Sequence, residues 1–166
     1  MLTLIIGPPD SGKSIRAEKL ALERSAPDER IYLATMIPYG EEGRSRVEKH
    51  RAQREGKGFR TIETPFDADH ALEQIAQPER TTVLLECLSN LVANELFERG
   101  TTVEETTACV LRQIRELQAG CRELVVVSNR FAREESYDAE TLEYIRCMDA
   151  VNEAVRQLAD EVEEIE

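Results

Sequence analysis

The chain has 166 residues, of which 41% are hydrophobic and 33% charged, and its formal net charge is −12. This composition is typical of a soluble globular protein, and we expect a single domain over residues 1–166. The acidic balance argues against a nucleic-acid partner and against docking on anionic membranes, because both depend on clustered lysine and arginine. No apolar run approaches the ~20 residues of a membrane-spanning helix.

The cysteines and the first residues indicate the compartment. The four cysteines show no C-x-x-C spacing, which argues against a zinc or disulfide framework. Met1–Ile6 is apolar, but it is too short for the apolar core of a secretory signal, and no basic segment precedes it. We therefore expect a cytoplasmic protein with reduced thiols.

In the first half of the chain, short apolar runs alternate with segments of helical periodicity. Leu2–Ile6 predicts a buried strand that enters a turn, and the apolar spacing from Ser14 to Arg24 predicts a helix after it. We then expect a buried strand at 31–34, a charged, solvent-facing helix at 41–55, an edge strand at 59–63 and a helix at 67–76 with Asp67 as its N-cap.

The same alternation continues in the second half. It predicts a buried strand at 81–86, a helix at 88–97, a helix from the capping box at 101–105 to about Gln118, a buried strand at 124–127, a helix at 138–158 and a short strand at 161–165. Buried strands that alternate with helices indicate the α/β class, with a mainly parallel sheet and helices on both faces. We expect the first strand at the centre of this sheet, between parallel neighbours.

The strongest motif is a complete G-x-x-x-x-G-K-[ST] pattern, formed by Gly7, Pro8, Pro9, Asp10, Ser11, Gly12, Lys13 and Ser14. It follows a predicted buried strand and opens a predicted helix, which is the context of a phosphate-binding loop. Gly7 and Gly12 allow backbone torsions that a side chain would block, so that the loop N–H groups and the helix N-terminus form an anion site. The pattern therefore predicts a P-loop NTPase (RecA-like) fold that binds a nucleoside triphosphate, GTP or ATP.

Two side chains of this loop and one acidic residue elsewhere predict how the triphosphate and Mg²⁺ are held. Lys13 can reach the β- and γ-phosphates, and the Ser14 hydroxyl can complete the shell of Mg²⁺. Glu86 closes the buried strand at 81–86, and ligands of parallel sheets bind beyond the carboxyl ends of the strands. Ser14 and Glu86 are therefore the candidate metal ligands.

His50 is the candidate nucleophile. It lies in a local basic patch with Arg44, Arg46, Lys49, Arg51 and Arg54. Arginine and lysine neutralise phosphate charge, and a neutral imidazole can attack phosphorus to form a phosphoramidate. The alternative interpretation is a solvated helix face that carries an incidental histidine. The second histidine, His70, is expected to be structural or exposed.

Several segments occur together in one order. They are the loop, Tyr32–Thr35, Arg46–Arg51, Leu84–Ser89, Asn94 with Phe97, and Val126–Asn129. In this combination the chain resembles the bifunctional adenosylcobinamide kinase / adenosylcobinamide-phosphate guanylyltransferase family of cobalamin (vitamin B12) biosynthesis, and the resemblance covers most of the chain.

The resemblance implies a two-step enzyme and places its residues. A nucleoside triphosphate first phosphorylates adenosylcobinamide, and GMP then passes from GTP through a guanylylated histidine to adenosylcobinamide phosphate. The histidine falls on His50, and Lys13 is the second catalytic residue. The nucleotide-binding positions fall on Gly7 to Ser14, Ala34, Thr35, Met36, Arg51, Ala52, Gln53, Arg54, Glu63 and Glu86. The resemblance also implies a homo-oligomer, a trimer.

The chain departs from the family pattern in several places, and two other functions stay open. Pro8, Pro9 and Asp10 replace the usual small or basic residues of the loop, Arg130–Asp138 replaces a glycine-rich segment, and Asp149 replaces a glycine. A GTP-binding regulatory homologue with reduced catalysis is one alternative, and another P-loop kinase of small metabolites is the other. Such a kinase transfers the γ-phosphoryl group directly and forms no covalent enzyme intermediate.

Overall fold

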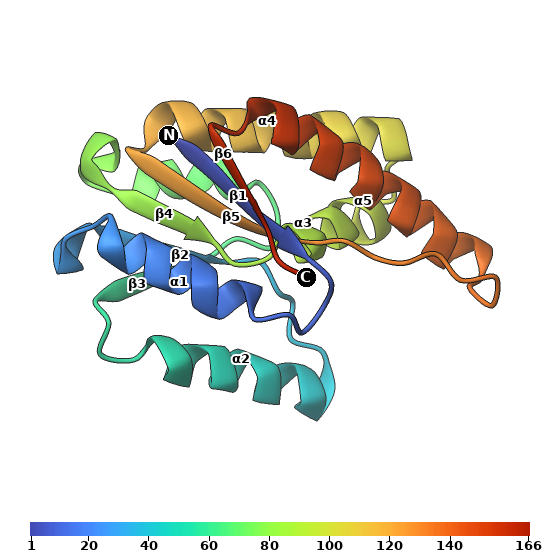
Figure 1. Ribbon diagram of the computed structural model, residues 1–166, viewed down its shortest axis with the longest axis horizontal. Coiled ribbons are helices and arrows are strands. Elements are labelled where there is room, and N and C mark those ends of the chain that lie inside the picture. The colour runs from blue at the N-terminus through green and yellow to red at the C-terminus, as the bar shows by residue number, and fades with distance from the viewer.

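A computed structural model, which describes residues 1–166, contains a six-stranded sheet in the order β3-β2-β4-β5-β1-β6 (Figure 1). All its strand pairs are parallel, which confirms the predicted α/β class. The strands are β1 (Leu2–Gly7), β2 (Arg30–Ala34), β3 (Phe59–Glu63), β4 (Thr82–Leu85), β5 (Glu123–Asn129) and β6 (Glu161–Glu164). β1 has parallel neighbours as predicted. Its predicted central place is wrong, because β1 lies next to the edge strand β6.

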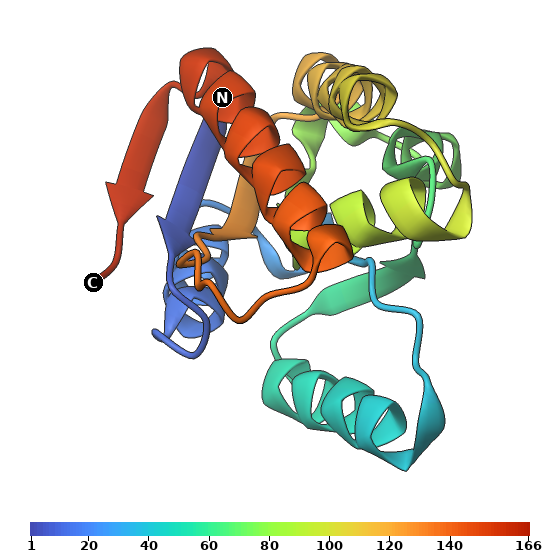
Figure 2. The ribbon, with the colours of Figure 1, turned by 90° about the vertical axis from the view of Figure 1, so that its right-hand side faces the viewer.

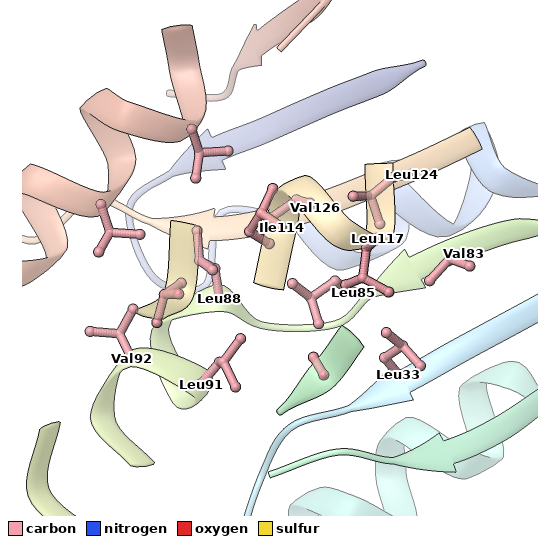
Figure 3. Packing of buried hydrophobic residues seen from close by; sticks show 14 of the residues in the cluster. Leu33, Val83, Leu85, Leu88, Leu91, Val92, Ile114, Leu117, Leu124 and Val126 are labelled. Atoms are coloured by element: carbon pink, nitrogen blue, oxygen red, sulfur yellow. The ribbon is translucent and has the colours of Figure 1, made fainter. Parts of the chain in front are cut away.

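Helices cover both faces of the sheet, as predicted (Figure 1). Helix α1 (Lys13–Glu23) lies on one face, where Ala17 and Leu20 pack against β1, β4 and β5. The other face carries the larger core, covered by α3 (Leu88–Ala93), α4 (Val103–Gly120) and α5 (Ala139–Leu158). There Leu85, Leu124 and Ile114 are fully buried (Figure 3). Each such side chain contributes ~1.5–3 kcal/mol relative to exposure.

Helix α2 (Gly40–Arg54) stands apart from these layers, beneath the β3 edge of the sheet (Figure 2). Only Gly43 and Arg54 of this helix are buried, which confirms the prediction of a solvent-facing helix. Because no apolar stripe fixes it to the sheet, individual polar contacts hold α2 in place. None of the helices combines the length and apolar character that a membrane crossing requires.

The predicted helix at 67–76 is a 3₁₀ helix, η2 (Ala68–Gln74), and its predicted N-cap is wrong. Asp67 has a left-handed backbone with φ of 49° and makes no capping hydrogen bond. Its carboxylate instead accepts two N–H groups of Arg99, at 2.8 and 3.1 Å, and this ion pair lowers the pKa of Asp67. A distant arginine therefore competes successfully with the local cap.

The predicted helix at 88–97 is divided into α3 and a π-helical turn, η4 (Asn94–Glu98). Asn94 begins this turn and donates hydrogen bonds to the carbonyls of Thr35 and Pro65, both at 2.8 Å. These bonds tie the turn to the segments that follow β2 and β3. Two further 3₁₀ turns, η1 (Pro27–Glu29) and η3 (Pro78–Arg80), complete the fold.

The capping box predicted before α4 is present. The Thr102 hydroxyl accepts the N–H of Glu105 at 3.1 Å, and the Glu105 carboxylate accepts the N–H of Thr102 at 3.3 Å. We expect Thr102→Ala to lower the free energy of unfolding by ~1 kcal/mol, since the N–H of Glu105 loses its partner. Urea denaturation measures this loss. Glu105→Gln keeps a capping box and is the matched control; an equal loss in both variants would contradict the assignment.

Candidate active site

The loop between β1 and α1 has the backbone that its motif predicts, with one correction. Gly12 is left-handed with φ of 85°, directly before the first residue of α1. Gly7 is the last residue of β1 and has no such torsion, so the torsional reason given for it is wrong. Its reason is space: a Cβ on Gly7 would lie 2.5 Å from the carbonyl oxygen of Ile165 and 3.1 Å from Ser11 Oγ.

Lys13 lies across this loop. Its Nζ donates hydrogen bonds to the Pro8 carbonyl at 2.7 Å and to Ser11 Oγ at 3.4 Å. The residue is only 6% exposed, and burial lowers the pKa of its ammonium group. The ammonium group is thus held at the loop by weak neutral acceptors, which charged phosphate oxygens can replace.

A cavity of about 200 Å³ opens in front of the loop, and we name it the loop cavity. The loop, the start of α1, α2 and the carboxyl ends of β4 and β5 contribute its wall: Pro9, Asp10, Ser11, Gly12, Lys13, Ser14, Met36, Arg46, His50, Glu86, Cys87, Asn90, Val127 and Asn129. Six of the eight motif residues therefore surround one space.

A second cavity, also about 200 Å³, lies between α2 and the strands β2 and β3, and we name it the helix cleft. The residues of its wall are Tyr32, Ala34, Met36, Pro38, Arg44, Val47, Glu48, His50, Arg51, Arg54, Thr61, Glu63 and Glu86. A much smaller inner pocket, about 10 Å³, is lined by Ser14, Glu18, Tyr32, His50, Gln53, Leu84, Glu86 and Val127.

His50 and Glu86 line all three spaces, and they are the only two residues that do. Nε2 of His50 lies 4.0 Å from Oε1 of Glu86, and the Glu86 side chain is only 9% exposed. The imidazole, carried by α2, thus meets a carboxylate at the end of β4. This pair lies where a ligand that occupies both the loop cavity and the helix cleft must pass.

The helix cleft is cationic on the α2 side and aromatic at its base. The Arg54 guanidinium lies 3.4 Å from the ring centroid of Tyr32 and donates to Thr61 Oγ1 at 3.1 Å. Arg51 donates to a carboxylate oxygen of Glu63, also at 3.1 Å. Burial raises the pKa of Tyr32, and the nearby Glu86 carboxylate adds to this shift, so the phenol stays neutral. The cleft therefore combines arginine side chains with an aromatic ring, which suits a polar, planar ligand.

Five predicted nucleotide-binding residues line neither the loop cavity nor the helix cleft: Gly7, Pro8, Thr35, Ala52 and Gln53. The Thr35 side chain is fully buried, and its hydroxyl donates to the Cys87 carbonyl at 2.8 Å. Gln53 lines the inner pocket instead. Of the basic patch, Lys49 lines neither space, and His70 is exposed.

Tyr32 and Asn129 are two of the wall residues that were not among the predicted site positions. Tyr32 forms the base of the helix cleft, and Asn129 lines the loop cavity, where its amide donates to Ser89 Oγ at 2.9 Å. The rule on carboxyl ends of parallel strands points to Asn129, since it ends β5 beside the loop. No local pattern distinguishes Tyr32 from an ordinary buried strand residue.

Cys87 lines the loop cavity, and its chemistry is testable. Burial raises the pKa of its thiol above the usual value. Because the thiolate is the reactive form, we expect slow alkylation by iodoacetamide at pH 7.5 and a rate that rises as the pH approaches 10. Peptide mapping of the alkylated protein measures the rate at each cysteine. A Cys87 rate that is fast and independent of pH would contradict this expectation.

Comparison with known proteins identifies the family. The model of the cobinamide kinase / cobinamide phosphate guanyltransferase family matches residues 3–165, nearly the whole chain. The chain belongs to this family. The resemblance stated from the motifs is thereby confirmed, and the chain is assigned to the transferases that act on cobinamide in cobalamin biosynthesis.

Two other comparisons do not bear on the family. A crystal structure of the RadB recombinase matches with 16% sequence identity and a TM-score of 0.47, over 87% of this chain and 70% of that chain. A search of curated proteins gives no match. The assignment to the cobinamide kinase / cobinamide phosphate guanyltransferase family therefore rests on the family model.

Proposed function

We propose that the chain catalyses both family reactions, phosphorylation of adenosylcobinamide and GMP transfer from GTP, and that His50 carries the GMP. One observation supports this above all: the His50–Glu86 pair lies at the junction of the loop cavity and the helix cleft. A GTP whose phosphates lie in the loop cavity and whose base lies in the helix cleft would have its α-phosphate at that junction.

In the guanylylation step, a ring nitrogen of His50 attacks the α-phosphorus of GTP. A P–N bond forms, the bond from the α-phosphorus to the bridging oxygen breaks, and pyrophosphate leaves. The imidazole gains positive charge as the bond forms, and the Glu86 carboxylate at 4.0 Å stabilises this charge or accepts the ring proton. Lys13 balances the charge of the departing pyrophosphate in the loop.

In the transfer step, a phosphate oxygen of adenosylcobinamide phosphate attacks the same phosphorus. A P–O bond forms, the P–N bond breaks, and the imidazole is released with adenosyl-GDP-cobinamide as product. The kinase step uses no histidine: the hydroxyl of the aminopropanol arm attacks the γ-phosphorus of a triphosphate in the loop cavity, and the nucleoside diphosphate leaves.

The residues present fit Mg²⁺ bound chiefly by substrate. Mg²⁺ prefers oxygen ligands and keeps water and substrate phosphates in its shell. The Ser14 hydroxyl and the Glu86 carboxylate line the same two spaces, the loop cavity and the inner pocket. No group of three or more His, Cys, Asp or Glu side chains forms a metal cage. We propose that Ser14 and Glu86 hold the ion, which would neutralise charge on the phosphates.

The test is a labelling experiment with GTP carrying ³²P at its α-phosphate, in the presence of Mg²⁺. We expect acid-labile, alkali-stable label on the wild-type protein, and none on His50→Ala. His70→Ala, which removes the other histidine, is the matched control and should label normally. Label retained by His50→Ala would refute the role of His50. No label on the wild type, with GTP binding intact, would favour a plain kinase or a regulatory GTP-binding protein.

The oligomeric state, the nucleotide donors and the cellular location are further proposals. We infer a homotrimer, which sedimentation equilibrium would test. We infer GTP as the guanylyl donor and GTP or ATP as the phosphoryl donor, which competition between the two nucleotides would resolve. We also infer a cytoplasmic location, consistent with the reduced thiols expected for the four cysteines.

A further inference from the structure

Glu18 is a buried carboxylate that the reactions described above do not use. It lies on α1, one turn after the loop, and is only 4% exposed. Glutamate is almost never buried unless it is paired, so its partners indicate its role. Both partners come from the segment that carries His50: Gln53 of α2 donates to Oε2 at 3.1 Å, and Lys57 pairs with Oε1.

These two contacts fix the helix that carries the candidate nucleophile. Gln53 follows His50 by three residues, so the two side chains share one face of α2, and both line the inner pocket. The Lys57 carbonyl in turn accepts an N–H of Arg30 in β2 at 2.7 Å, which anchors the segment after α2 to the sheet. Since α2 lacks an apolar stripe, such polar contacts determine where His50 lies.

We infer that Glu18 is a positioning residue: its contacts with Gln53 and Lys57 latch the His50 helix onto the phosphate-loop helix. The inference rests on the proposed function, because it assigns the latch to the guanylylation step. One carboxylate joins the element that binds phosphate to the element that supplies the nucleophile. It thereby holds the imidazole beside Glu86, at the junction of the loop cavity and the helix cleft.

The latch predicts a selective defect. In Glu18→Gln the bond to Gln53 is retained but the ion pair with Lys57 is lost, and in Lys57→Met the same pair is lost from the other side. We expect guanylylation of His50 to slow roughly 10- to 100-fold in each, because small misplacements of a reacting group carry penalties of this order. Phosphorylation of adenosylcobinamide should be unchanged, since that step uses no histidine.

A second readout needs no nucleotide. Diethyl pyrocarbonate modifies exposed, neutral imidazoles, and the chain has two histidines, of which His70 is exposed and serves as an internal reference. The His50 side chain is 29% exposed, so loss of the latch should raise its modification rate relative to His70. The double variant Glu18→Gln/Lys57→Met should resemble each single variant, since all three lose one interaction.

The matched control is Glu104→Gln/Arg146→Met. This pair, at 3.5 Å, joins α4 to α5 on the far side of the sheet and should change neither readout. An unchanged His50:His70 ratio in the latch variants, or guanylylation and phosphorylation that fall together, would overturn the inference. If the wild type carries no label on His50, the proposed function fails, while the modification ratio still decides whether the latch exists.

Discussion

A Lys13→Met variant is expected to lose both phosphorylation of adenosylcobinamide and GMP transfer, each by at least roughly a hundredfold. Both reactions place a triphosphate in the loop cavity, and Lys13 is the only lysine that lines it. Methionine keeps much of the apolar stem and removes the ammonium group that now bonds to Pro8 and Ser11. Chromatography of the corrinoid products measures both activities, and a fluorescent GTP analogue measures binding.

The control for this variant is Lys19→Met, on the exposed side of the same helix. It removes the same charge from α1 without touching the loop, so both activities should remain. The informative contrary result is a Lys13→Met protein that loses one reaction and keeps the other. It would mean that the two triphosphates bind in different places and that the loop cavity serves only one step.

Gly7→Ala should produce the second large effect, a loss of stability of ~1–3 kcal/mol together with weaker nucleotide binding. A methyl group at this position would lie 2.5 Å from the carbonyl oxygen of Ile165, which is backbone and cannot rotate away. The N–H of Ile165 donates to the Ile6 carbonyl at 2.9 Å, so the overlap strains the contact between β1 and the segment after β6. Urea denaturation and GTP titration measure the two effects.

Two further variants distinguish a steric clash at Gly7 from backbone strain at Gly12. Gly12→Ala meets no atom within 4 Å, and its φ of 85° predicts only the strain of a left-handed residue, roughly 1–2 kcal/mol. Removing Ile165 and Glu166 should make Gly7→Ala nearly harmless relative to the shortened parent chain. If the substitution is as damaging without Ile165 as with it, the steric explanation is wrong.

The sequence predicts the elements whose determinants are local. Apolar runs such as Leu124–Val127 locate the buried strands, because strands covered on both faces are apolar throughout. Thr102 and Glu105 locate the start of α4, since a capping box needs only four consecutive residues. The phosphate loop is found for the same reason: motif, strand and helix are contiguous.

Features that depend on distant partners are not predictable in this way. Aspartate is a residue type that favours N-caps, but the Asp67 carboxylate binds Arg99, thirty-two residues away, instead of capping the helix. The charged pattern of α2 shows a surface helix but not that His50 turns toward Glu86. The contact between Gln53 and Glu18 leaves no periodic signal, because it joins two helices through side chains 35 residues apart in the chain.

Two departures from the family pattern prove to be related. Arg133, in the segment that replaces a glycine-rich loop, donates to the carboxylate of Asp149, where the family often has glycine, at 2.7 Å. The side chains of Arg133 and Asp149 are 61% and 48% exposed, so their ion pair contributes little to stability, in the range of ~0–1 kcal/mol. The pair joins the segment after β5 to α5, a contact that a glycine at position 149 could not make.

The position of β1 in the sheet has a consequence for the order in which the protein becomes active during synthesis. The strand that leads into the phosphate loop is made first, yet its two partners, β5 and β6, come from residues 123–129 and 161–164. Contacts between such distant segments form late, because the intervening chain must first be closed into a loop. A ribosome-bound chain that lacks β5 therefore has the G-x-x-x-x-G-K-S sequence without the wall that Val127 and Asn129 give the loop cavity, and we expect nucleotide binding only after β5 has paired with β1.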